Sequence, residues 1–359
     1  AYDLIGRRLD APMTTPAPLA LAAHLAEARR HGARAVVMEV SSHSLSQRRV
    51  AGIPFRVAVF TNLSGDHLDY HGTMQAYAAA KKRLFDSLAA AGTAVVNADD
   101  PSSSCMLSDC PARVLRYGLV EEAEVRGRVA ALSADGSEID VTFGASRCRL
   151  RTPLLGRHNV MNVLAAIGAG LSLGLDLAAA CRGVSSVKQV RGRLEPVETG
   201  TLGFALVVDY AHTDDALKNA LGALRPVTKG RLWCVFGCGG DRDRSKRPRM
   251  AQAAEAQADR IVVTSDNPRG EDPSDIIGDI RAGFSEAGLA RCHFDADRAR
   301  AIAWAIGQAD RNDTVLIAGK GHEGYQIVGA RRLHFDDVEI AAAAVARRGE
   351  PIAGVASEV

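Results

Sequence analysis

The 359 residues of this chain lack the features that are typical of membrane, nucleic-acid-binding and disulfide-rich proteins. No apolar run approaches the roughly 20 residues of a membrane-spanning helix, and no signal peptide opens the sequence. The 44 basic and 42 acidic residues leave a net charge of +2, so no global field attracts nucleic acid or an anionic membrane. The seven cysteines lack metal-type pairing, which favours reduced thiols. We therefore expect a cytoplasmic protein without nucleic-acid partners or membrane insertion, whose anion binding is local.

Two common phosphate-binding motifs are also absent. No G-x-x-x-x-G-K-[ST] stretch occurs, so the phosphate-cradling loop of an ordinary ATPase is missing. The stretch Gly237–Asp243 is not a G-x-G-x-x-G fingerprint, because Arg242 stands where the last glycine would be. The first residue is Ala1 rather than Met, which leads us to expect that upstream sequence is missing.

The sequence has instead the alternation of apolar runs and amphipathic stretches that is typical of α/β proteins. Residues 113–153 switch to short alternating stretches, which predict an antiparallel hairpin beside a parallel sheet. The pattern predicts two doubly wound domains with mostly parallel sheets, residues 1–190 and 191–359. Strands are expected at 35–40, 57–60, 94–96, 204–208, 232–236, 260–264, 292–294 and 314–317, and helices at 19–30, 74–90 and 159–173.

Three polar loops follow apolar strands in the second half of the chain. They are Gly237–Asp243, Asp266–Arg269 and Ala318–Glu323. Ligands of open α/β sheets collect outside the carboxyl ends of the strands, and these loops carry guanidiniums, carboxylates and glycines. We therefore predict one binding site built from all three loops.

Other polar groups also follow expected strands, and each has a plainer interpretation. Glu39 and His67 could hold Mg²⁺ beside a phosphate, although His67 could equally cap a turn. Asn159 and Asn162 lie three apart and could face a purine edge, although Asn159 could be a helix cap. Asp209 could accept hydrogen bonds from ribose hydroxyls or cap the following helix.

Taken together, the ordered motifs of this chain resemble those of the Mur ligases, in the branch that adds meso-diaminopimelate. The match runs over nearly the whole chain, and seven motifs in the family's order are highly specific. The matching segments are Glu39–His43, Asp66–Gly72, Gly156–Asn159, Asp209–Thr213, Phe236–Asp243, Asp266–Arg269 and Gly319–Glu323.

The resemblance implies an ATP-dependent, ADP-forming ligase of peptidoglycan precursor synthesis. The family has an N-terminal UDP-binding domain, a central ATPase domain and a C-terminal Rossmann-like domain, and this chain resembles the last two. The first domain and the P-loop would precede residue 1, so the central domain would be incomplete and this chain alone inactive. The reaction would join diaminopimelate to UDP-MurNAc-L-Ala-D-Glu through an acyl phosphate, with ATP and Mg²⁺, in a monomer.

The resemblance also assigns roles to residues at matching positions. Glu39, His67 and Lys81, the last as a carbamate, would be catalytic and hold Mg²⁺. The UDP-MurNAc-dipeptide would contact Thr14, Thr15, Ser41, Gln47 and Arg49. ATP would contact Asn159, Asn162, Arg193, Asp209 and Lys246. Diaminopimelate would contact Arg242, Asp266, Asn267, Pro268, Arg269, Gly319 and Glu323.

Arg269 is the residue that separates diaminopimelate from lysine in this resemblance. Lysine-adding members lack it, and diaminopimelate has a second carboxylate that a guanidinium can pair bidentately.

His212 is available as a general base, but nothing else in the sequence supports that role. Alternatives are a binding protein without ligase activity, a lysine-adding or other Mur-type ligase, and a folylpolyglutamate or cyanophycin synthetase, which would not explain Asp266–Arg269.

Overall fold

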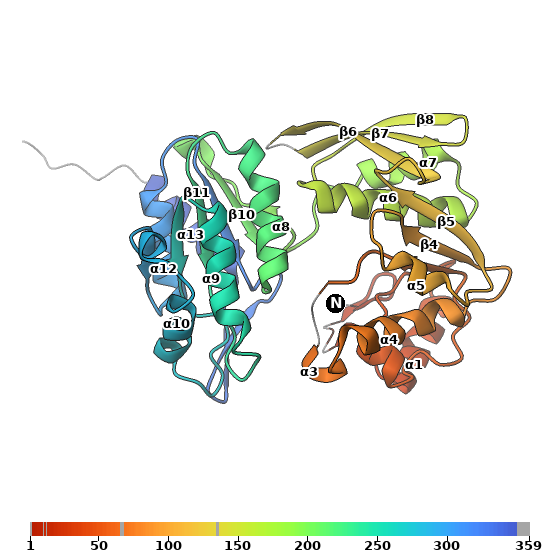
Figure 1. Cartoon of the computed structure of the whole chain (residues 1–359), viewed down its shortest axis with the longest axis horizontal. Coiled ribbons are helices and arrows are strands. Elements are labelled where there is room, and N and C mark those ends of the chain that lie inside the picture. The colour runs from red at the N-terminus through yellow and green to blue at the C-terminus, as the bar shows by residue number, and fades with distance from the viewer. Residues whose placement is uncertain (1, 10, 12, 65–67, 134–135, 350–359) are drawn as a thin grey trace, which may run out of the picture. The chain divides into compact units, whose positions relative to one another are not determined.

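The structure is a computed structural model that describes residues 2–9, 11, 13–64, 68–133 and 136–349. The chain divides into two compact units (Figure 1). The first comprises residues 1–127, 142–147 and 161–180, and the second comprises 128–141, 148–160 and 181–359. No helix of the described residues is long and apolar enough to cross a membrane.

A six-stranded sheet with the order β3-β4-β5-β6-β7-β8 lies in the N-terminal half. β3 to β6 are parallel neighbours. Only two residues connect β7 to β8, which is too short for a parallel crossover, so these strands form the expected antiparallel hairpin. The strands are β3 (Val57–Phe60), β4 (Thr93–Asn97), β5 (Arg113–Gly118), β6 (Val125–Ser133), β7 (Gly136–Phe143) and β8 (Ser146–Thr152), and a separate two-stranded ribbon contains β1 (Tyr2–Asp3) and β2 (Arg8–Leu9).

The helices of this half follow local signals in the sequence. Pro18 opens α1, and Thr73 caps α4 by accepting a hydrogen bond from the backbone N–H of Ala76. Apolar side chains of both helices pack with those of β3 and β4 in one core. The helices are α1 (Pro18–Arg30), α2 (Ser42–Ser46), α3 (Leu68–His71), α4 (Met74–Asp86), α5 (Ser103–Leu107), α6 (Arg157–Ser172) and α7 (Leu177–Ser185).

The strand expected at 35–40 does not form. Only its end contacts the core: Met38 and Val40 pack against the core, whereas Val36 and Val37 are 52% and 95% exposed. No strand of the described residues pairs with this segment, and a strand without a hydrogen-bonding neighbour is not held in place. The prediction of a strand at 35–40 is therefore wrong, because no ladder of hydrogen bonds from the described residues holds this segment.

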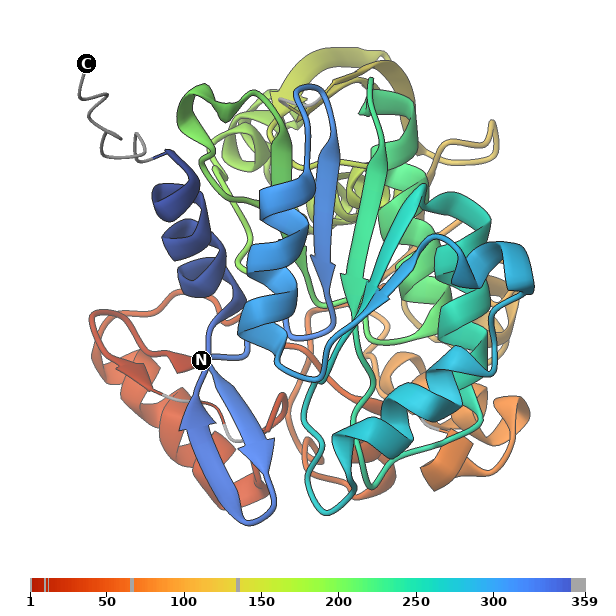
Figure 2. The ribbon, with the colours of Figure 1, turned by 90° about the vertical axis from the view of Figure 1, so that its left-hand side faces the viewer.

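The C-terminal half contains a second six-stranded sheet with the order β13-β12-β11-β14-β10-β9 (Figure 2). The first five strands are parallel, and β9 pairs antiparallel at one edge. Its strands are β9 (Glu195–Pro196), β10 (Ala205–Asp209), β11 (Leu232–Phe236), β12 (Arg260–Val263), β13 (Cys292–Phe294) and β14 (Thr314–Ala318), and a two-stranded hairpin is formed by β15 (Tyr325–Val328) and β16 (Arg331–His334).

Helices cover both faces of this sheet, because alternate strand residues enter two separate cores. On β11, Cys234 and Phe236 pack with helices α8, α9 and α10, whereas Trp233 and Val235 pack with α12 and α13. The doubly wound α/β fold is thereby confirmed. The helices are α8 (Asp214–Leu224), α9 (Lys246–Gln257), α10 (Pro273–Arg281), α11 (Glu286–Leu289), α12 (Arg298–Gln308) and α13 (Asp337–Gly349), with 3₁₀ turns at Gly200–Leu202 and Arg225–Val227.

Candidate functional site

The three polar loops lie at one edge of the C-terminal sheet. Phe236 pairs with Val263 and Val235 with Ile317 in parallel register, so β11, β12 and β14 end together. A fourth loop joins them after β10, because Asp209 pairs with Ala318. The four carboxyl ends therefore lie side by side at one edge of the sheet, and the three loops of the predicted site are neighbours there.

Glycines allow the loops after β11 and β12 to touch through their backbones. Gly240 donates a backbone hydrogen bond to the carbonyl of Asn267 at 2.9 Å. A Cβ at Gly240 would lie 1.9 Å from the carbonyl oxygen of Pro268, and one at Gly237 would lie 2.2 Å from that of Thr264. Any side chain at these two positions would push the loops apart.

Arg269 sits where this loop pair meets the hairpin β15–β16. Its backbone has a φ of 52° and exchanges hydrogen bonds with Ile327 and Gly329. One guanidinium nitrogen, Nη1, donates to the carbonyl of Gly240 at 2.9 Å. In the described part of the chain no carboxylate forms an ion pair with Arg269, so its charge is available to an anion.

Carboxylates face the same region. Asp266 is 8% exposed; Gln326 donates to its backbone carbonyl, and no described residue hydrogen-bonds its carboxylate. A Cβ at Gly319 would lie 2.7 Å from Asp266 Oδ2, which places the β14 loop against this carboxylate. Glu323 accepts a hydrogen bond from the amide of Asn267 at 3.0 Å. Both acids could bind ammonium groups of an amino acid.

The predicted amino-acid-binding residues are thus brought together by the fold. Asn267 links the loop after β12 to the loop after β14 and to β15, since its Oδ1 accepts hydrogen bonds from Lys320 Nζ at 3.1 Å and from the backbone N–H of Ile327. Arg242 lies exposed on the same loop as Gly240, and without an ion pair among the described residues. The combination of two unpaired guanidiniums with two carboxylates suits a ligand that carries both carboxylates and ammoniums.

A second group of predicted residues surrounds the loop after β10. Asp209 accepts backbone hydrogen bonds from Leu194 at 2.7 Å and Ala211 at 2.8 Å, and burial raises the pKa of its carboxyl above the usual value. Lys246 donates to the carbonyl of His212 at 3.2 Å, and Arg193 lies over the ring of Tyr210. Asp209 thus holds the backbone of the loop in place, whereas contacts of these residues with a nucleotide stay predictions.

The two asparagines of α6 differ in environment. Asn159 is buried inside α6, and its amide donates to the carbonyl of Leu155 at 2.8 Å. Asn162, one turn later, is exposed. A helix cap would accept a hydrogen bond at its side-chain oxygen, so this donated bond is not a cap, and a purine contact by either residue stays a prediction.

The predicted dipeptide-binding residues lie close together in the N-terminal unit. Thr15 Oγ1 donates to the carbonyl of Glu39 at 2.9 Å and accepts from the backbone N–H of Ser41 at 3.1 Å. Arg49 donates to Gln47 Oε1 at 2.8 Å and to the carbonyl of Thr15 at 3.1 Å. Thr14, beside them, is exposed.

The predicted magnesium site is only partly visible. His67 lies outside the described residues, and Glu39 is exposed. The Lys81 ammonium lies 5.1 Å from the centre of the Tyr77 ring. Within the described ranges, no group of three His, Cys, Asp or Glu side chains could hold a metal ion. The described residues do not by themselves form a complete metal-binding set, and a magnesium ion would need further ligands.

Two buried arginines, which the sequence does not reveal as functional, hold the loops of the candidate site. Arg247 is fully buried and pairs with Glu271 at 2.7 Å and Asp279 at 2.8 Å, while Glu271 also accepts from the backbone N–H of Asp241. Arg298 is buried against Asp337. In sequence, Arg247 belongs to the basic run Ser245–Arg249, which gives no sign of burial.

Comparison with known proteins identifies the family of this chain. Residues 2–170 match the Mur ligase middle domain, and residues 192–321 match the Mur ligase glutamate ligase domain. The chain belongs to the Mur ligase family, as its motifs predicted, and is therefore built as an ATP-dependent amino-acid ligase.

Among the members of the family, the chain is similar to ligases that are named for diaminopimelate. The chain is 49% identical over 341 residues to the UDP-N-acetylmuramoyl-L-alanyl-D-glutamate--2,6-diaminopimelate ligase of Synechococcus sp. strain WH7803, covering 93% of this chain and 68% of that protein. It is 45% identical to the enzyme of the same name from Gloeobacter violaceus, covering 96% and 70%. A solved structure of such a ligase has 39% identity and a TM-score of 0.63, covering 92% and 69%. Thermotoga maritima MurF in complex with ADP, at 17% identity and a TM-score of 0.63 over 86% and 65%, shares the fold.

Replacing Gly240 by alanine tests the contact between the loops. Because the new Cβ would lie 1.9 Å from a backbone oxygen, the loops must separate, and we expect amino-acid binding to weaken at least about tenfold, the equivalent of roughly 1.4 kcal/mol. Isothermal titration calorimetry measures the change. Gly278→Ala in α10, where a Cβ meets nothing within 4 Å, is the control and should bind normally. Equal binding by both variants would contradict the geometry.

Replacing Arg247 by methionine tests the buried pair. We expect the free energy of unfolding to fall by about 3 kcal/mol, the low end for a broken buried pair because Glu271 and Asp279 are partly exposed. Arg244→Met removes an exposed partner of the same Asp279 and should cost less than about 1 kcal/mol in urea unfolding. A loss of equal size in both variants would show that burial of Arg247 is immaterial.

Acid titration tests the other partner of this pair. Hydrogen bonds from Arg247 lower the pKa of Glu271 from 4.5 to about 2. A carboxyl with a depressed pKa stabilises the folded state above its unfolded value, so this contribution is complete above pH 4.5 and is lost as the pH falls towards 2. Glu271→Gln should flatten the dependence of unfolding free energy on pH in that window. An unchanged slope would argue against the pairing.

Proposed function

We propose that this chain forms the central and C-terminal domains of a UDP-N-acetylmuramoyl-L-alanyl-D-glutamate--2,6-diaminopimelate ligase, the activity that the names of its relatives give for them. The supporting observation is Arg269, a half-buried guanidinium with no ion-pair partner in the described part of the chain, held between two loops and a hairpin. Diaminopimelate offers a distal carboxylate to such a group, and lysine does not.

The residues of the site would bind different parts of the substrates according to their charge. Arg269 and Arg242 would bind carboxylates of the amino acid, and Asp266 and Glu323 its ammonium groups. The loop after β10, with Arg193, Asp209 and Lys246, would hold the nucleotide, and Asn159 and Asn162 its base. The group Thr14, Thr15, Ser41, Gln47 and Arg49 would bind the UDP-MurNAc-dipeptide.

The reaction would proceed by positioning more than by covalent participation of the protein. ATP would convert the dipeptide's terminal carboxylate to an acyl phosphate, which the amine of diaminopimelate would attack with loss of phosphate. Mg²⁺ would lower the repulsion among phosphate oxygens when bound, with Glu39, His67 and carbamylated Lys81 as proposed ligands. Asp266, buried at 8% exposure, would orient the attacking amine.

We further propose that residues 1–190 and 191–359 act as two domains of a cytoplasmic monomer. The match to the middle domain ends at residue 170 and the match to the glutamate ligase domain begins at residue 192, which supports this boundary. Gel filtration would test the monomer, since a dimer would elute at twice the 37.9 kDa mass of the chain.

Replacing Arg269 by alanine tests the substrate. The value of kcat/KM with meso-diaminopimelate should fall by at least about 100-fold, because a charge-assisted bidentate pair is lost, while the slow reaction with L-lysine should not fall. The measurement is ADP release in a protein that also contains the relatives' N-terminal segment. Arg260→Ala, at the opposite end of β12, should leave both rates unchanged. Unchanged preference in Arg269→Ala would reject the assignment of the pocket.

A further inference from the structure

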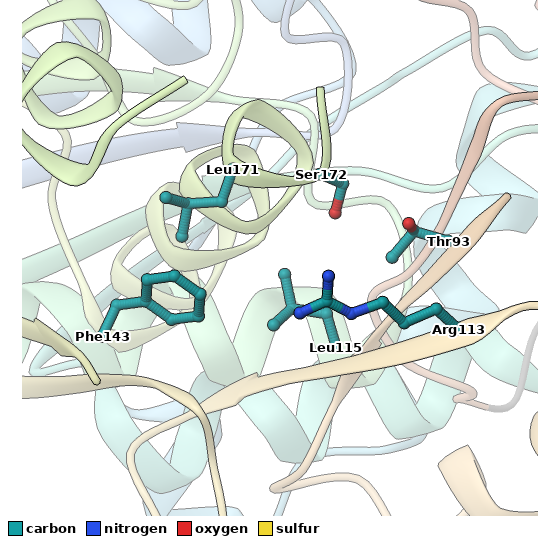
Figure 3. A pocket seen from close by; sticks show the side chains of 6 residues that line it. All are labelled: Thr93, Arg113, Leu115, Phe143, Leu171 and Ser172. Carbon is teal, nitrogen blue, oxygen red and sulfur yellow. The ribbon is translucent and has the colours of Figure 1, made fainter. Parts of the chain in front are cut away.

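A pocket in the N-terminal unit has no part in the proposed reaction. It has a volume of about 220 Å³. Its lining comes from the starts of β4 and β5, the end of β7 and the last turn of α6 (Figure 3). The lining residues are Thr93, Arg113, Leu115, Phe143, Leu171 and Ser172.

The pocket lies away from the candidate site of this unit. Thr93 and Arg113 are the first residues of parallel strands, whereas Mur-type loops follow the strands' carboxyl ends. Ser172 ends α6 ten residues after Asn162, which corresponds to roughly 15 Å along the helix axis. A ligand in the pocket would therefore not occupy the proposed base-binding position.

The lining of the pocket contains one charged side chain, two hydroxyls and three apolar side chains. Figure 3 shows the Arg113 side chain reaching into the pocket, with the hydroxyls of Thr93 and Ser172 on one side and Leu171 and Phe143 on the other. No hydrogen bond or ion pair to another described residue engages the Arg113 guanidinium. Ser172 Oγ donates to the carbonyl of Gly168 at 2.8 Å and keeps lone pairs for a donor.

A positive charge without a partner beside an apolar wall is typical of a site for a small amphiphilic anion. The guanidinium would pair a carboxylate, and Leu115, Leu171 and Phe143 would cover a ring or branched chain. The volume is below the roughly 300 Å³ at which pockets for drug-sized ligands begin, so the ligand must be small.

We propose that this pocket binds a small aromatic or branched monocarboxylate, with Arg113 pairing the carboxylate and Phe143 and Leu171 contacting the apolar group. The site is independent of the proposed ligase function, because it shares no residue with it. No acidic side chain lines the pocket, so an anion meets no opposing charge there.

Benzoate is a suitable probe, and benzamide is its uncharged counterpart of the same shape. Calorimetry on the chain should show one saturable benzoate site with a dissociation constant of about 1 mM or tighter, as expected for a ligand of this size. Benzamide should bind at least about tenfold more weakly. Arg113→Gln and Phe143→Ala should each weaken benzoate binding by at least about tenfold.

Two control variants separate this pocket from other cationic positions. Arg34→Gln removes an exposed arginine elsewhere in the same unit, and Arg269→Gln removes the one in the proposed amino-acid pocket. Both should bind benzoate as the unaltered chain does. Amide chemical shifts of Leu115, Phe143 and Ser172 should move on titration. The proposal is overturned if benzoate does not saturate, if Arg113→Gln binds it equally, or if Arg269→Gln alone abolishes binding.

Discussion

The candidate site depends on the buried guanidinium of Arg298. Arg298 and Asp337 are both fully buried, and Arg298 donates through Nε and Nη2 to the two carboxylate oxygens at 2.8 and 2.7 Å. Nη1 also donates to the carbonyl of Ser265, just after β12, and Nη2 to that of Ala318, the last residue of β14. A buried ion pair is tolerable only when its hydrogen bonds are satisfied, and here they fix two strand ends that carry site loops.

Arginines in this half of the chain fall into two kinds. Arg298 and Arg247 are buried and paired with carboxylates, and they hold backbone in position. Arg269 and Arg242 have no carboxylate partner in the described part of the chain, and they border the space that the loops enclose. Because the paired arginines fix the loops, the unpaired ones can present charge to a ligand without reorganisation, which is the condition for selective anion binding.

The sequence predicted the features that are encoded locally. Strands such as 57–60, 232–236 and 292–294 were placed to the residue because apolar runs and turn residues bound them. The adjacency of the three loops followed from the parallel direction of their strands, whereas their role as a binding site stays a prediction. The strand predicted at 35–40 was wrong, because a strand needs a neighbouring strand to hydrogen-bond with as well as an apolar pattern. Arg247 and Arg298 could not be recognised, since their partners lie 24 to 39 residues away and burial of a charge leaves no periodic signal.

The most direct test of this account is a crystal structure of the chain with meso-diaminopimelate. The account predicts that one carboxylate of the ligand pairs with the guanidinium of Arg269 and that an ammonium lies against Asp266 or Glu323, with the loops after β11 and β12 unmoved. A ligand bound with no carboxylate near Arg269, or bound only after these loops separate, would contradict it.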